Sequence, residues 1–277
     1  FLHPAQREIV TKNFNGPARV SGSAGTGKTI VALHRAAHLA RNNRGSRVLL
    51  TTFSPALANN LRFKLQTLIR AEPRLSEQID VYSIDSIARR LYELKFGKAN
   101  IASDADIFER IRKSSEAIGD HKFTNHFLTS EWKNVIDSWN ITEWESYRDI
   151  ARLGRKTRLP EAQRKKVWPI FANVRESLSK NGVLTESIIY SELTGNLNQG
   201  APTPFDYAVV DEAQDLAPAQ LRFLAALARE RDNGLFFAGD LGQRIFQQAF
   251  SWLSLGVDIR GRSRNLKINY RTSHQIR

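Results

Sequence analysis

Residues 20–37 read VSGSAGTGKTIVALHRAA and contain a glycine-rich phosphate-binding loop. The core of the stretch matches the pattern GxxxxGK[ST], with a β-rich run before it and a helical pattern after it. Glycines let consecutive backbone N–H groups converge on phosphate oxygens, and the N-terminus of the following helix adds a favourable dipole. The stretch therefore predicts a bound nucleotide. The residues expected to contact it are Gly22, Ser23, Ala24, Gly25, Thr26, Gly27, Lys28 and Thr29.

A second, acidic motif supplies what a nucleotide site needs for hydrolysis. Lys28 is expected to reach the terminal phosphates and Thr29 to bind Mg²⁺. In VVDEAQDL (209–216), Asp211 comes at the end of an apolar run, where it can bind the metal, and Glu212 is placed to polarise the attacking water. The alternative is that the two acids merely end a strand and open a helix with favourable charge. Asp211 comes 182 positions after Thr29, which predicts a large insertion between the two motifs.

The pattern of apolar runs predicts an α/β fold built on a parallel sheet. Short β-rich runs recur and alternate with helical patterns, as in doubly wound proteins. The predicted strands are residues 18–22, 47–53, 79–84, 207–212, 234–240 and 266–269. Between about Ser86 and Gly200 only amphipathic helical patterns occur, which predicts an inserted all-helical subdomain.

Composition limits the class of protein and the kind of partner. The 277 residues carry 41 Lys+Arg against 28 Asp+Glu, which leaves a formal charge of +13. This balance fits a polyanionic partner and fits a solvated basic surface about equally well. The chain has no cysteine, no run of apolar residues long enough to cross a membrane and no signal-peptide pattern, so we expect a cytoplasmic protein without membrane contact.

Seven motifs in order along the chain resemble those of the superfamily 1 helicases of the UvrD/Rep/PcrA type. The glycine-rich loop GSAGTGKT resembles motif I and VVDEAQDL resembles motif II, in the DExQD form. The other five are LHPAQREIV (Q motif), VLLTTFSPALANNL (Ia), VYSIDSIARRL (Ib), FFAGDLGQRIF (III) and INYRTSHQI (IV). The resemblance implies a P-loop NTPase (RecA-like) core with a helical insertion. Domain 1A would comprise residues 1–88 and 203–277, and domain 1B residues 89–202. Motifs V and VI, which the family carries on a second RecA-like domain, do not occur in this sequence.

The resemblance also implies roles for residues around the nucleotide. Gln6 would read the adenine and Tyr270 would stack on it. Gln243 would sense the γ-phosphate, and Arg271 would contact that phosphate and stabilise charge in the transition state. With Lys28 and Glu212, Gln243 and Arg271 form the expected catalytic set.

Residues for DNA contact are implied by motifs Ia, Ib and III. Phe53 would line a single-strand path, where an aromatic face can stack on any base. The other implied contacts are Ser83, Asp85, Phe246 and Trp252. For the aromatic residues, packing in the core is an equally good interpretation. Two positions depart from the family: Asp85 stands where the family has histidine, and Gln248 stands where it has tryptophan.

The resulting functional hypothesis is the N-terminal portion of an ATP-dependent DNA helicase or translocase, with ATP and Mg²⁺ as cofactors and 3′→5′ polarity. Its expected partners are single-stranded and duplex DNA and a C-terminal RecA-like domain, and we expect a monomer. By itself this stretch is expected to bind nucleotide weakly and to unwind nothing. The alternative is a nucleic-acid-binding module that ATP switches without unwinding. A small-molecule kinase fits the Gln243 and Arg271 motifs poorly.

Overall fold

The computed structural model describes residues 2–119, 121–151, 158–228, 231–240 and 252–270. The strands in this part of the chain are β1 (Ala18–Gly22), β2 (Val48–Thr52), β3 (Ile79–Ser83), β4 (Tyr207–Asp211), β5 (Leu235–Ala238) and β6 (Ser263–Leu266). They form one sheet in the order β3-β2-β4-β5-β1-β6, and every neighbouring pair is parallel. The predicted α/β class is confirmed.

Five of the observed strands lie within the predicted runs, and the sixth is shifted. The sequence predicts a strand at 266–269, whereas β6 spans Ser263–Leu266. Its register is set by pairing with β1, from Arg19 opposite Ser263 to Gly22 opposite Leu266. Because β1 ends at Gly22, its partner strand ends at Leu266, and the residues that follow turn toward the glycine-rich loop. The prediction rested on the apolar residues of LKIN (266–269), which suggested a buried strand. Ile268 in this run is exposed.

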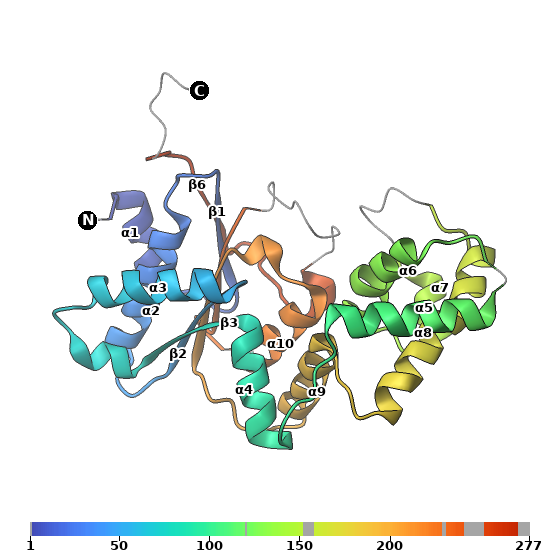
Figure 1. Cartoon of the computed structure of the whole chain (residues 1–277). Helices are drawn as coiled ribbons and strands as arrows, with labels where there is room; N and C mark the ends of the chain where they lie inside the picture. Colours follow the sequence, from blue (N-terminus) through green and yellow to red (C-terminus); the bar gives the residue numbers. More distant parts are fainter. Residues whose placement is uncertain (1, 120, 152–157, 229–230, 241–251, 271–277) are drawn as a thin grey trace.

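Helices cover both faces of the sheet (Figure 1). On one face lie α1 (Pro4–Thr11), α2 (Lys28–Asn42) and α3 (Pro55–Leu68), and on the other α4 (Ile84–Phe96), α9 (Glu186–Asn198) and α10 (Pro218–Ala228). Neighbouring strand residues point to opposite faces. Leu50 thus belongs to the hydrophobic cluster under α2, and Leu49 to the cluster under α10. Burial on both faces explains why the strands read as nearly continuous apolar runs.

A separate helical body lies beside the sheet (Figure 1). It consists of α5 (Asp104–Ile118), α6 (Asn125–Glu131), a π-helical turn (Trp132–Asp137), α7 (Trp144–Asp149) and α8 (Glu161–Lys180). These elements share their own hydrophobic cluster, which includes Ile111, Tyr147 and Phe171. In the described part of the chain, no helix is long and apolar enough to cross a membrane.

The hydrophobic clusters divide the chain at a different place from the predicted domain boundaries at 88/89 and 202/203. Helix α9 and most of α4 fall inside the predicted insertion, yet they pack into the cluster under α10 on the sheet. The two connections to the helical body pair with each other, because Leu184 donates to the carbonyl of Asn100 at 2.8 Å and accepts from Ala102 at 2.9 Å. The helical cluster therefore extends from near residue 101 to near residue 184, while the domain boundaries stay predictions.

The parallel sheet brings distant motifs to one edge. Val20 of β1 and Asp211 of β4 both pair with Ala238 of β5. Since the carboxyl ends of parallel strands meet at the same edge, the segments that follow these three strands face a shared crevice.

Candidate nucleotide-binding site

The glycine-rich loop has the backbone that its glycines predict. Gly25 and Gly27 have φ angles of 85° and 83°, in the left-handed region that favours glycine. At Gly22 the reason is different. A Cβ there would lie 2.5 Å from Thr26 Oγ1 and 2.9 Å from the carbonyl oxygen of Leu266. Gly22 is therefore packed against the Thr26 hydroxyl of the same loop and against the end of β6. Gly27 is the N-terminal cap of α2.

Three donors outside the loop hold its carbonyl groups. Gln6 Nε2 donates to the carbonyl of Thr26 at 3.1 Å, and Asn269 Nδ2 donates to that of Ala24 at 3.0 Å. The backbone N–H of Tyr270 donates to the carbonyl of Gly25 at 2.9 Å. In a trans peptide the N–H points opposite to the carbonyl. The N–H groups of Gly25 and Gly27 thus point away from these donors, the arrangement that suits phosphate binding at a helix N-terminus.

Lys28 lies folded over the loop. Its Nζ donates to the carbonyls of Gly22 at 2.7 Å and Ser23 at 3.0 Å. A phosphate could exchange for these carbonyls, because all are oxygen acceptors for the same ammonium group.

The predicted metal ligands meet across the crevice. Asp211 is 5% exposed, and its carboxylate accepts a hydrogen bond from the side chain of Thr29. Burial, with a smaller contribution from the charge of Glu212, raises the pKa of Asp211 to about 6, and the Thr29 hydrogen bond opposes this rise. A buried carboxylate beside a hydroxyl is a donor set that fits Mg²⁺, which prefers oxygen ligands and would favour the ionised carboxylate.

Glu212 follows directly and has an unusual backbone. Its φ of 55° places a non-glycine residue in the left-handed region, which costs of order 1–3 kcal/mol. Its carboxylate accepts a hydrogen bond from Gln214 Nε2 at 2.6 Å. Gln214 was not predicted as a site residue, although it lies within the motif VVDEAQDL.

The predicted base-binding residues gather on one side of the loop. The ring of Tyr270 is exposed and its centroid lies 6.0 Å from that of His3, at the start of α1. The backbone N–H of His3 donates to Gln6 Oε1 at 3.1 Å. His3 and Asn269 were not predicted as site residues. The only sequence feature that could have pointed to them is their place in the chain, His3 shortly before Gln6 and Asn269 directly before Tyr270. The predicted residues Gln243, Phe246 and Arg271 lie outside the described residues.

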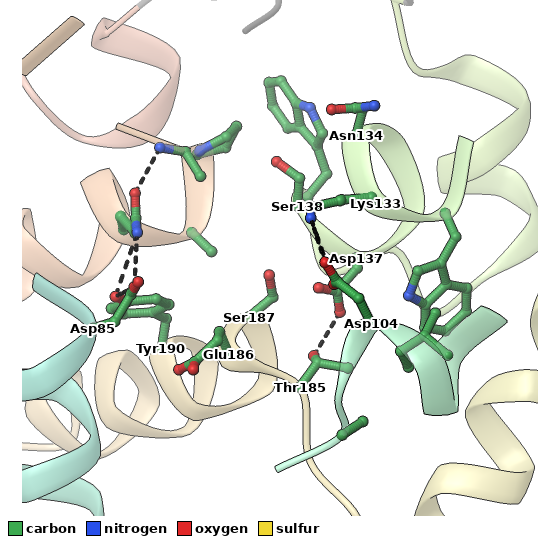
Figure 2. A pocket seen from close by; sticks show the side chains of 18 of the residues that line it. Asp85, Asp104, Lys133, Asn134, Asp137, Ser138, Thr185, Glu186, Ser187 and Tyr190 are labelled. Carbon is green, nitrogen blue, oxygen red and sulfur yellow. Dashed lines mark hydrogen bonds and ion pairs between the residues drawn. The ribbon is translucent and has the colours of Figure 1, made fainter. Parts of the chain in front are cut away.

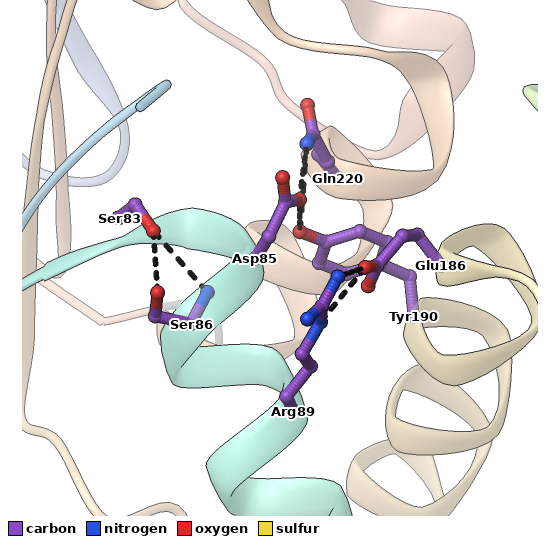
Figure 3. A network of polar contacts seen from close by, with 7 residues as sticks. All are labelled: Ser83, Asp85, Ser86, Arg89, Glu186, Tyr190 and Gln220. Atoms are coloured by element: carbon purple, nitrogen blue, oxygen red, sulfur yellow. Dashed lines mark hydrogen bonds and ion pairs between the residues drawn. The ribbon is translucent and has the colours of Figure 1, made fainter. Parts of the chain in front are cut away.

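The described residues predicted to contact DNA fall into two groups by exposure. Phe53 is 43% exposed. Trp252 is only 7% exposed and packs edge-on against Phe237 with ring centroids 4.5 Å apart. Ser83 is buried, and its hydroxyl caps α4 by accepting from the N–H of Ser86 at 3.3 Å (Figure 3). The core-packing alternative therefore describes the position of Trp252, while DNA contact by these residues stays a prediction.

Asp85 is part of a polar junction between α4, α9 and α10. Its carboxylate accepts from the hydroxyl of Tyr190 and from Gln220 Nε2, the latter at 3.0 Å (Figure 3). Nearby, Arg89 of α4 forms an ion pair with Glu186 of α9. Asp85 thus ties three helices together through its side chain.

A cleft of about 650 Å³ lies between this junction and the helical body (Figure 2). Phe53 contributes to its lining, and Lys133 forms an ion pair with Asp104 there. The acidic residues that line the cleft are Asp85, Asp104, Asp137 and Glu186. Two of these carboxylates are in ion pairs, Asp104 with Lys133 and Glu186 with Arg89, so their charges are partly balanced within the protein.

The fold and this site define a P-loop nucleotide-binding protein with a helical body inserted into its α/β core. The chain belongs to the UvrD/Rep helicase N-terminal domain family, whose model matches residues 2–250. A probable DNA helicase of Mycoplasma pneumoniae is 30% identical over 93% of this chain and 49% of its own length. The ATP-dependent DNA helicase UvrD2 of Mycobacterium tuberculosis is 27% identical over 88% of this chain and 37% of its own. The ATP-dependent DNA helicase PcrA of Bacillus subtilis is 25% identical over 89% of this chain and 33% of its own length. The chain thus spans between about a third and a half of these relatives.

Proposed function

We propose that this chain supplies the ATP-binding and hydrolysing N-terminal portion of an ATP-dependent DNA helicase. The observation that carries the proposal is the convergence of Lys28, Thr29, Asp211 and Glu212 at one edge of the sheet, around a loop whose carbonyls are held from outside. Membership of the UvrD/Rep family and the names of the relatives support DNA as the polymer.

The chain's own residues divide the chemistry among them. Lys28 would exchange the carbonyls of Gly22 and Ser23 for the terminal phosphates, and Thr29 and Asp211 would hold Mg²⁺. When bound there, Mg²⁺ would neutralise charge at the phosphates. Glu212 orients and polarises the attacking water. Gln6 and Tyr270 contact the base. The 3′→5′ polarity, the monomeric state and the cytoplasmic location stay predictions from the sequence.

The test is ATP hydrolysis and strand separation by the full-length protein, with and without single-stranded DNA. We expect DNA to stimulate hydrolysis. We expect Lys28→Ala to abolish both hydrolysis and unwinding, because the glycine-rich loop then lacks the cation proposed to bind the terminal phosphates. Hydrolysis that DNA does not stimulate, without unwinding, would instead support the ATP-switched binding module. DNA affinity should also fall steeply with salt concentration if the protein tracks phosphates.

A further inference from the structure

The segment after β4 and the end of β5 are in closer contact than any side chain at position 239 would allow. A Cβ at Gly239 would lie 2.5 Å from Gln214 Oε1 and 2.9 Å from the backbone nitrogen of Ala213. Gly239 in turn donates its N–H to the carbonyl of Val20 in β1 at 3.1 Å. The end of β5 is therefore fixed between the phosphate-loop strand and the residues that follow Glu212.

The side chain of Gln214 spans this contact. Its Nε2 donates to Glu212 Oε2 at 2.6 Å, and its Oε1 accepts the backbone N–H of Asp240 at 3.1 Å. Gln214 is buried, so water does not compete freely for either hydrogen bond. One amide group thus connects the carboxylate of Glu212 to the backbone at the end of β5.

The direction of the Glu212 side chain depends on its hydrogen bond with Gln214. It lies after the end of β4 and before the short 3-10 helix Ala213–Asp215, with the left-handed backbone noted above. Regular secondary structure therefore does not fix the direction of its side chain. Because Gln214 engages one of the two carboxylate oxygens, it restricts rotation about the last side-chain bond of Glu212.

We infer that Gln214 is a positioning residue for hydrolysis, which sets the place of the Glu212 carboxylate according to the position of residues 239–240. The inference rests on the proposed role of Glu212 in polarising water. Gln214 itself takes no proton and contacts no reacting atom. A shift of the β5 end changes the hydrogen bond at Gln214 Oε1, and the amide passes that shift to Glu212.

Two variants of the full-length protein test the two hydrogen bonds of the Gln214 amide separately. Gln214→Met keeps the length of the side chain and removes both hydrogen bonds. Gln214→Glu keeps an acceptor for the N–H of Asp240, but when ionised it cannot donate to Glu212. For both we expect kcat of DNA-stimulated hydrolysis to fall about 10- to 100-fold, since an ångström-scale misplacement of a catalytic group costs this much. KM and the dissociation constant of a fluorescent ATP analogue should change less than about threefold. Gln163→Met, at an exposed glutamine in α8, is the matched control.

Combining Gln214→Met with Glu212→Gln tests whether Gln214 acts through Glu212. In single-turnover hydrolysis the double variant should be no slower than Glu212→Gln alone, because the carboxylate to be positioned is gone. The inference would be overturned if the fold-losses in rate of the two single variants multiplied in the double variant. A loss of nucleotide affinity in Gln214→Met as large as its loss of kcat would also overturn it. If Glu212→Gln alone leaves kcat unchanged, the proposed role of Glu212 fails instead. Should Gln214→Met not fold, Gly239→Ala disturbs the same contact from the β5 side and should give the same split between kcat and KM.

Discussion

Gln6 Nε2 lies 3.1 Å from the carbonyl oxygen of Thr26 and donates a hydrogen bond to it. The residue proposed to read the base is thus attached directly to the loop proposed to hold the phosphates. A Cβ at Gly27 would lie only 2.5 Å from the same nitrogen, so the Gln6 amide could not keep this position beside a residue with a side chain there.

Replacing Gln6 with alanine should weaken binding of ATP through both the base and the loop. We expect about a tenfold higher dissociation constant for ATP, since a buried hydrogen bond contributes about 1 kcal/mol and the carbonyl of Thr26 loses its donor. Tripolyphosphate, which has no base, should also bind more weakly. Titration calorimetry with both ligands measures this, with Gln163→Ala as an exposed control. Unchanged affinity for tripolyphosphate would show that the hydrogen bond to Thr26 does not support the loop.

Asn269→Ala should lower affinity for every triphosphate by the same factor. Asn269 donates to the carbonyl of Ala24 at 3.0 Å, a contact with the loop and not with the base, so loss of this hydrogen bond should not alter discrimination between bases. We expect a three- to tenfold effect, from about 1 kcal/mol per hydrogen bond. Competition binding of ATP, GTP and tripolyphosphate is the measurement. A change in the ratio of ATP to GTP affinity would contradict a role confined to the loop.

Arg35→Met should destabilise the fold and loosen α1. Arg35 is 1% exposed and donates to the carbonyls of Val10 at 2.6 Å and Lys12 at 2.8 Å, at the C-terminal end of α1. Burial lowers the pKa of its guanidinium to about 10. Removing it leaves these carbonyls without a charged donor, so we expect a loss of about 2–4 kcal/mol in the free energy of unfolding, measured by urea denaturation. Arg41→Met, which breaks the more exposed ion pair with Glu72, should cost less than about 1 kcal/mol. Similar losses in the two variants would contradict this account.

Phe53 and Trp252 should behave oppositely when replaced. Phe53→Ala removes an exposed ring, so we expect single-stranded DNA affinity to fall by about 1–3 kcal/mol with little change in stability. Trp252→Phe alters a buried ring beside Phe237, so the thermal midpoint should fall while DNA affinity stays within about twofold. Fluorescence anisotropy with labelled DNA and thermal melts together distinguish the two. A larger loss of DNA affinity in Trp252→Phe than in Phe53→Ala would reverse the assignment.

The local geometry of the candidate nucleotide site was predictable from the sequence. The positive φ angles at Gly25 and Gly27, and the acids at the end of β4, follow from residue types at fixed spacing. Contacts between distant segments were not predictable. Nothing in the residues around Asn269 shows that its amide reaches Ala24, and Ser83 reads as an available hydroxyl until its cap on α4 is seen. The end of β6 was misplaced for the same reason, because its register comes from β1.

The sequence by itself determined the class of fold and the residue types at the candidate site, since apolar runs, glycine geometry and carboxylate position act within a few residues. Only the tertiary structure decided the strand order β3-β2-β4-β5-β1-β6 and the packing of α4 and α9 on the sheet rather than in the helical body. It also decided that Gln214 connects Glu212 to the end of β5. The physical reason is that each of these depends on which apolar faces and which hydrogen-bonding groups from remote parts of the chain satisfy one another when water is excluded.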